Sequence, residues 1–150
     1  MIIGNGGHAK VIRDFIRFFD FKGTIIAVGD NKSRKEEAQR HADDLFCTLV
    51  HPRAYVARDV EIGAGTVIMA GAIVQPATRI GKHVIINTRA SVDHDCSIGD
   101  FAHIAPGCVL CGNVSVGEGA FLGVGTLVVP GVTISPWAFI KAGTLVKRDV

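Results

Sequence analysis

The amino-acid sequence predicts a mainly β protein, in which a parallel β-helix of about five coils follows a small, incomplete Rossmann-like β-α-β unit. Three observations predict this fold. Every sixth residue from Val56 to Val146 is Val, Ile or Leu, at sixteen positions, although only 40 of the 150 residues are of these types. The residue four places after each of the first fifteen is small or β-branched. Gly directly follows many of the sixteen, and the chain holds 18 Gly but only 7% aromatic residues.

The repeat defines the second of two predicted domains, residues 51–150. Each six-residue unit is expected to form a short strand and a corner, so that three units close a triangular coil of about 18 residues. The large aliphatic side chain points inward, the small one fills the remaining interior, and Gly suits the corner because it tolerates positive φ. Cys108 falls in the small inward column, so the Cys108–Cys111 pair is interpreted as core filling and not as a redox or zinc motif.

The first domain, residues 1–50, has a different pattern. Residues 1–4 and 24–28 are predicted to be short buried strands, and the polar residues 31–44 a helix. A helix between the two strands is predicted by apolar residues at helical spacing, namely Val11, Ile12, Phe15, Ile16 and Phe19. Two strands make a poor parallel sheet by themselves, and for this reason the unit is described as incomplete.

A glycine-rich turn joins the first strand to the first helix. Gly4, Gly6 and Ala9 match the pattern G-x-G-x-x-A, which allows a phosphate to approach the backbone at the start of a helix. The pattern alone is weak, and a tight turn without a ligand is the alternative. No acidic residue stands where a dinucleotide ribose would need one, so NAD binding is not expected.

Composition excludes several classes of function. The net charge is only +2 with no basic cluster, so nucleic acid is not an expected partner. No apolar run is long enough to span a bilayer, and the first residues lack the features of a signal peptide. Four cysteines without a disulfide-like spacing suit a reducing compartment, and a cytoplasmic location is expected.

Two stretches resemble one known family. Residues 86–107 (INTRASVDHDCSIGDFAHIAPG) and residues 6–11 (GGHAKV) closely resemble the hexapeptide-repeat acetyltransferases that include sialic-acid O-acetyltransferases and bacterial nucleotide-sugar N-acetyltransferases. The resemblance implies a left-handed β-helix, a homotrimer, acetyl-CoA as co-substrate and a sugar or nucleotide sugar as acceptor. Family members carry one more strand, with an acidic pair that contacts the nucleotide, before the match to residues 25–29. They also continue beyond the match to residues 146–150.

The resemblance also implies roles for individual residues in acetyl transfer. The residue matching His94 is the family's catalytic base, and the one matching Asp95 raises its basicity. The match to Gly112 offers a backbone N–H to the thioester carbonyl. The residues that contact acetyl-CoA match His103, Val124 and Ala142.

The acceptor is implied to bind on the first domain. The residues that line the nucleotide-sugar pocket of the family match Gly6, Gly7 and His8. The leading prediction is an acetyl-CoA-dependent transfer to the amine of a nucleotide-linked amino sugar, by direct attack on the thioester, with sialic-acid or other sugar O-acetylation as the alternative.

Coil geometry provides an independent check on these roles. Residues 18 apart should stack, which places Gly112 one coil above His94 and aligns Pro106, Val124 and Ala142 in one apolar column. His94 and His103 are nine residues apart, half a coil, so they lie on different sides of one prism. They should meet only across a subunit boundary, and this makes a trimer part of the predicted mechanism.

Two other classes of function remain open at this stage. A β-helical carbonic anhydrase would hold zinc with three histidines, and His83, His94 and His103 are the conceivable set. Their spacings of 11 and 9 lack the close pair expected there, so no metal is predicted. The second alternative is a solenoid that binds ligands without turnover.

Overall fold

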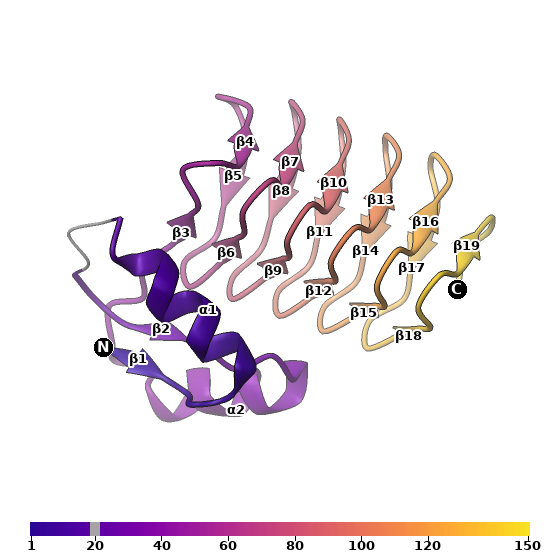
Figure 1. The fold of residues 1–150 in the computed structure, drawn as a ribbon. Helices are drawn as coiled ribbons and strands as arrows, with labels where there is room; N and C mark the ends of the chain where they lie inside the picture. The colour runs from indigo at the N-terminus through magenta and orange to yellow at the C-terminus, as the bar shows by residue number, and fades with distance from the viewer. Residues whose placement is uncertain (19–21) are drawn as a thin grey trace.

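The computed structural model describes residues 1–18 and 22–150, and it is a left-handed parallel β-helix of about five coils with an N-terminal β-α-β-α unit against its first coils (Figure 1). All β-helix strands are two residues long and belong to three parallel sheets. The covered sheet, which faces the N-terminal unit, contains β3 (Leu49–Val50), β6 (Val67–Ile68), β9 (Ile85–Ile86), β12 (His103–Ile104), β15 (Phe121–Leu122) and β18 (Phe139–Ile140).

The other two sheets complete the triangular section. The apolar sheet contains β4 (Tyr55–Val56), β7 (Ile73–Val74), β10 (Ser91–Val92), β13 (Val109–Leu110), β16 (Leu127–Val128) and β19 (Leu145–Val146). The polar sheet contains β5 (Glu61–Ile62), β8 (Arg79–Ile80), β11 (Ser97–Ile98), β14 (Ser115–Val116) and β17 (Thr133–Ile134). The strand register pairs His103 with Phe121 and Ser91 with Val109, so the predicted coil of 18 residues is confirmed.

The core lies inside the coils, as the repeat predicts. The second residue of each strand points inward, and most of these side chains are buried. The column of small residues is buried as well, including Cys108 and Thr66. The Thr66 hydroxyl donates to the Gly81 carbonyl at 2.7 Å, so this polar group is buried with a partner.

The first residue of each strand points outward, and the three faces differ in character. The outer residues of the polar sheet are Glu61, Arg79, Ser97, Ser115 and Thr133, which suits contact with water. The outer residues of the apolar sheet include Tyr55, Ile73, Val109, Leu127 and Leu145, and all five are exposed. The covered sheet buries its first outer residues, Leu49, Val67 and Ile85, beneath the N-terminal unit.

The N-terminal unit consists of β1 (Ile2–Ile3), α1 (Gly7–Ile16), β2 (Ile25–Ile26) and α2 (Asn31–Arg40). The two strands pair in parallel, and the apolar face of α1 packs on the covered sheet through Ala9, Ile12 and Phe15. Phe19, which the sequence places on this helix, lies outside the described residues.

The second helix is shorter than predicted and ends at Arg40 instead of residue 44. The Asp44 N–H donates to the His41 carbonyl, and its carboxylate accepts a hydrogen bond from the Thr24 hydroxyl at 2.9 Å. Asp44 therefore ends a turn and is bound to Thr24, the residue before β2, so it does not continue the helix. Within the described residues, neither helix has the length and apolar composition needed to cross a membrane.

Candidate functional site

The corner between β10 and β11 presents His94 to solvent. The side chain is 60% exposed, and its Nδ1 lies 2.7 Å from Oδ2 of Asp95. Asp95 has φ 59°, a left-handed conformation that Asp tolerates better than most residues, and this turns its carboxylate back toward the imidazole. The Asp93 carboxylate accepts the His94 backbone N–H at 2.9 Å and so holds the corner from the other side.

The two carboxylates determine how the imidazole can act. Because an ionised carboxylate only accepts, Nδ1 carries the proton in that hydrogen bond, and Nε2 of the neutral ring is left with a lone pair. The hydrogen bond that Nδ1 donates to Asp95, together with the charge of Asp93, raises the pKa of His94. A histidine with a raised pKa is a stronger base once it is neutral, and this matches the role predicted for His94 and Asp95.

Gly112 lies directly above the imidazole. The Asn113 N–H donates to the His94 carbonyl at 2.9 Å, which confirms that the two corners stack. A Cβ at position 112 would lie 2.6 Å from Cε1 and 2.7 Å from Nε2 of His94. No hydrogen bond of the Gly112 N–H is found within the described part of the chain. Gly112 is itself buried, and only glycine leaves room for this ring.

The corner between the covered and apolar sheets carries the predicted apolar column. Gly125 N–H donates to the Pro106 carbonyl at 3.0 Å, and Gly143 N–H donates to the Val124 carbonyl at 2.8 Å, so successive corners stack. Val124 is 56% exposed and Ala142 is exposed. The column therefore offers a smooth apolar track on which the pantetheine arm of a CoA molecule can lie.

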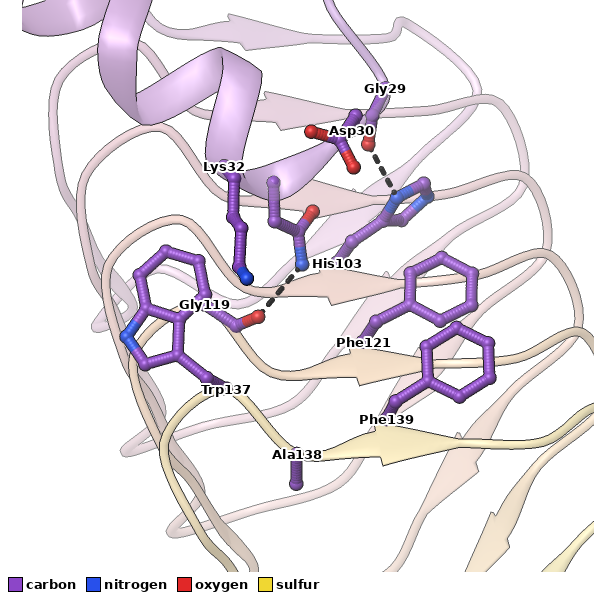
Figure 2. Close-up of a pocket in the computed structure, with 10 residues that line it drawn as sticks. Gly29, Asp30, Lys32, His103, Gly119, Phe121, Trp137, Ala138 and Phe139 are labelled. Atoms are coloured by element: carbon purple, nitrogen blue, oxygen red, sulfur yellow. Dashed lines mark hydrogen bonds between the residues drawn. The ribbon is translucent and has the colours of Figure 1, made fainter.

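His103 has a different environment from His94. It belongs to β12 of the covered sheet and is 8% exposed beneath the N-terminal unit. Its Nδ1 lies 3.3 Å from the Gly29 carbonyl, shown dashed in Figure 2, and its Nε2 lies 3.0 Å from Nδ2 of Asn87. Burial and the nearby Arg34 cation lower the pKa of His103 to about 3, so the ring is neutral at physiological pH.

The predicted acceptor residues lie at the start of α1. Gly7 is the first residue of the helix and Gly6 is its N-cap, with no side-chain cap and open space where a Cβ would stand at either position. The backbone N–H groups of this turn are therefore accessible to a phosphate. His8 is half-buried beside Gly29, its Nε2 has no hydrogen-bond partner among the described residues, and burial lowers its pKa to about 4.

The described residues also form a large cavity that His94 does not line. It occupies about 680 Å³ over the covered sheet, between α2 and the rings of Phe121, Phe139 and Trp137 (Figure 2). His103 is the one imidazole in its wall, and it is hydrogen-bonded on both nitrogens. The two carboxylates and the free Nε2 are at the His94 corner, which is not part of the lining of this cavity.

Sequence reasoning missed Asn87 and Arg34, which hold His103 and Gly29 in place. Asn87 stands at the corner that follows β9, and only its contact with a residue 16 positions away reveals its part. Arg34 lies on a polar helix, and nothing in its local sequence indicates that it is 1% exposed.

The three histidines conceivable as zinc ligands do not come together in one chain. His83 is buried against Phe101 with parallel rings, while His94 is exposed at another corner. Among the described residues, no group of three or more His, Cys, Asp or Glu side chains could hold a metal ion.

Comparison with known proteins gives consistent results. Residues 77–112 match the family model for the bacterial transferase hexapeptide (six repeats). UDP-N-acetylbacillosamine N-acetyltransferase from Bacillus subtilis (strain 168) is 40% identical over 46% of this chain, and the chain spans only 50% of that relative.

Two solved structures match almost the whole chain. PerB from Caulobacter crescentus, in complex with CoA and GDP-perosamine, is 36% identical with a TM-score of 0.93, and the match covers 99% of this chain and 88% of that one. The acetyltransferase domain of PglB from Neisseria gonorrhoeae FA1090, in complex with acetyl coenzyme A, is 30% identical with a TM-score of 0.94, covering 99% and 90%.

Proposed function

Because this chain belongs to the family of bacterial hexapeptide-repeat transferases, we propose that it transfers the acetyl group of acetyl-CoA to the amine of a nucleotide-linked amino sugar. The observation that carries the proposal is the corner where the imidazole of His94, oriented by Asp95, lies directly beneath Gly112, whose N–H has no partner among the described residues. Structural relatives that bind acetyl-CoA, or CoA with GDP-perosamine, support both substrates.

The proposed reaction is a direct transfer within a ternary complex. The acceptor amine attacks the thioester carbon while Nε2 of His94 removes its proton, and the Gly112 N–H donates to the oxygen as it becomes negative. The tetrahedral intermediate then collapses, the C–S bond breaks, and the CoA sulfur leaves as a thiol with the proton that His94 held. General-base assistance is worth about 10²- to 10⁴-fold, and one oxyanion donor about 10²- to 10³-fold.

The remaining predicted residues bind the two substrates in this proposal. The column of Val124 and Ala142 holds the pantetheine arm, with His103 at its edge. Gly6, Gly7 and His8 hold the diphosphate and sugar of the acceptor through the open turn before α1. Residues 1–50 thus form the acceptor-binding domain and residues 51–150 the acetyl-transfer domain. A cytoplasmic location is part of the proposal, because acetyl-CoA and reduced thiols occur there.

A homotrimer completes the proposed site. The exposed apolar sheet separates the His94 corner from the corner of Val124 and Ala142. If three copies turn this sheet toward a common axis, the His94 corner of one copy meets the Val124 corner of the next. The exposed row of Tyr55, Ile73, Val109, Leu127 and Leu145, interrupted by Ser91, is an apolar strip of the kind that self-association buries. We propose two further copies of this chain as its occupants.

A charge on this strip should separate the subunits. Leu127 is 45% exposed and lies on β16, next to the last strand of the strip. For Leu127→Asp we expect a folded monomer by light scattering and circular dichroism. Activity should fall at least about tenfold, because the two halves of each site separate. Thr133→Asp, on the polar sheet, is the matched control and should remain a fully active trimer. A monomer of Leu127→Asp with parental activity would contradict the shared site.

The function itself is tested by an acetyl-CoA consumption assay with a panel of acceptors. With UDP- or GDP-linked 4-amino sugars as acceptors, the parent protein should release free CoA and give an N-acetylated product, detected by mass spectrometry. The His94→Ala variant should give neither with the same acceptors. Sialic acid is the alternative acceptor in this panel, since turnover with sialic acid alone would establish O-acetylation instead. Tight acetyl-CoA binding without turnover on any acceptor would favour a binding solenoid and reject the proposal.

A further inference from the structure

Arg34 is a buried cation that forms no ion pair among the described residues. It lies on α2, is 1% exposed, and directs its guanidinium between the N-terminal unit and the β-helix. Its N–H groups donate at 2.7–3.1 Å to the carbonyl oxygens of Val28, Gly29, His83 and Phe101 and to Oδ1 of Asn31. A buried charge is tolerated only when it is fully hydrogen-bonded, and the forked guanidinium can reach all of these acceptors at once, whereas an ammonium cannot.

One of these acceptors connects Arg34 to His103. The Gly29 carbonyl accepts from Nη1 of Arg34 at 3.1 Å and also faces Nδ1 of His103 at 3.3 Å. Figure 2 shows the second of these contacts, with Gly29 and Asp30 directly above the imidazole. The position of the carbonyl is therefore set by Arg34, and the carbonyl in turn orients the ring.

The opposite nitrogen of the ring is fixed as well. Oδ1 of Asn87 accepts the Thr88 N–H at 2.8 Å, so it is the Nδ2 group of Asn87 that faces Nε2 of His103 at 3.0 Å. Nδ2 can only donate, and therefore Nε2 must carry the lone pair. The proton of the neutral ring is then on Nδ1, where it donates to Gly29. Both contacts select the same tautomer.

We propose that Arg34 is a positioning residue for acetyl transfer, which through the Gly29 carbonyl holds His103 in one orientation and one tautomer at the edge of the acetyl-CoA track. His103 is three residues before Pro106, the first member of the track, and in the proposed site a displaced ring is therefore expected to weaken the binding of acetyl-CoA. The inference rests on the proposed function for its kinetic consequence but not for its hydrogen-bond geometry. The proposed site thereby gains a residue from α2, which lies outside both stretches that carry the family resemblance.

The charges around His103 agree with this role. Arg34 and His8 face it from α2 and α1, and Asp30 and Lys32 line the same cavity. Burial, the Arg34 charge and the neighbouring His8 all lower the pKa of His103, against the single opposing effect of the hydrogen bond to Gly29. His103 therefore takes up no proton at neutral pH, and His94 is the one of the two imidazoles that serves as the base.

The test compares Arg34→Lys with Arg40→Met, a control that removes an exposed arginine from the same helix. Steady-state kinetics on the trimer should show KM for acetyl-CoA raised about tenfold in Arg34→Lys, with kcat within about threefold of the parent, because His94 is untouched. Nitrogen NMR of the free protein should show a neutral His103 protonated on Nδ1 in the parent and Arg40→Met down to about pH 4. In Arg34→Lys the Nδ1 signal should shift and its proton should exchange faster with water, because the Gly29 carbonyl that accepts it is no longer held, while Asn87 still selects the same tautomer.

Each outcome decides the question. Parental KM and an unchanged Nδ1 signal in a folded Arg34→Lys trimer would reduce Arg34 to a structural residue. If that variant does not fold, the parent spectrum still decides, since a His103 protonated on Nε2 contradicts the proposed relay. If the parent binds acetyl-CoA but lacks transferase activity, the proposed function fails. The NMR comparison and the dissociation constant for acetyl-CoA still test Arg34 in that case.

Discussion

His94→Ala should lower kcat by about 10²-fold or more while KM for acetyl-CoA changes little. The loss should fall on proton transfer, because in the proposed site the thioester is held by the N–H of Gly112 and the corner of Val124 and Ala142, and the substitution changes neither. The side chain is 60% exposed, so its removal opens no cavity and the trimer should keep its melting temperature. Stopped-time assays of free CoA release across a range of pH provide the measurement.

The pH profile distinguishes a base from a merely polar corner residue. The hydrogen bond that His94 donates to Asp95 raises the pKa of His94, so the parent should lose activity as the pH falls through that raised value and the imidazole becomes protonated. Asp95→Asn removes the charge and lowers the pKa of His94, which should move this acidic limb to lower pH with a smaller loss at neutral pH. An ammonium acceptor sheds its own proton at high pH, so the deficit of His94→Ala should shrink there. Near-parental turnover of a folded, trimeric His94→Ala at neutral pH would show that another group is the base.

The β-helix could be predicted almost completely from the sequence, because its contacts are periodic. Every strand pairs with the strand one coil away, so the inward column of Val, Ile and Leu determines sheets, register and core together. The same spacing predicted that Gly112 stacks on His94 and that Val124 aligns with Ala142. These parts of the site repeat the geometry of the coil, and for them sequence separation converts directly into distance.

The docking of the N-terminal unit could not be predicted in this way. Arg34 reaches Phe101 across 67 positions, and Gly29 reaches His103 across 74, with no period that links them. The sequence around Arg34 also favours the wrong prediction, since an arginine on a polar helix is normally expected to be exposed to water. The helix end at Arg40 was missed for a similar reason, because Asp44 is recruited by Thr24, a partner 20 positions earlier.

Gly112→Ala should be almost as damaging as removal of the base itself, although it adds a single methyl group. The new Cβ would stand 2.6–2.7 Å from Cε1 and Nε2 of His94, closer than real side-chain contacts allow. His94 is exposed, so the ring can swing aside and the fold should survive, but the imidazole then leaves Asp95 and the reaction path. We expect kcat to fall about 10²-fold at unchanged melting temperature, since small displacements of a catalytic group have effects of this size.

A double-mutant cycle identifies the cause of that loss. If the methyl acts by displacing the imidazole, Gly112→Ala should cost much less in the His94→Ala background than in the parent, because the ring that it displaces is already gone. Any remaining cost there measures the disturbance of the Gly112 N–H as an oxyanion donor. Purely additive losses in the two backgrounds would show that the residues act independently, and the stacked arrangement would then not be the reacting site. Parental activity of Gly112→Ala would contradict it more directly, since no productive His94 fits beneath that methyl group.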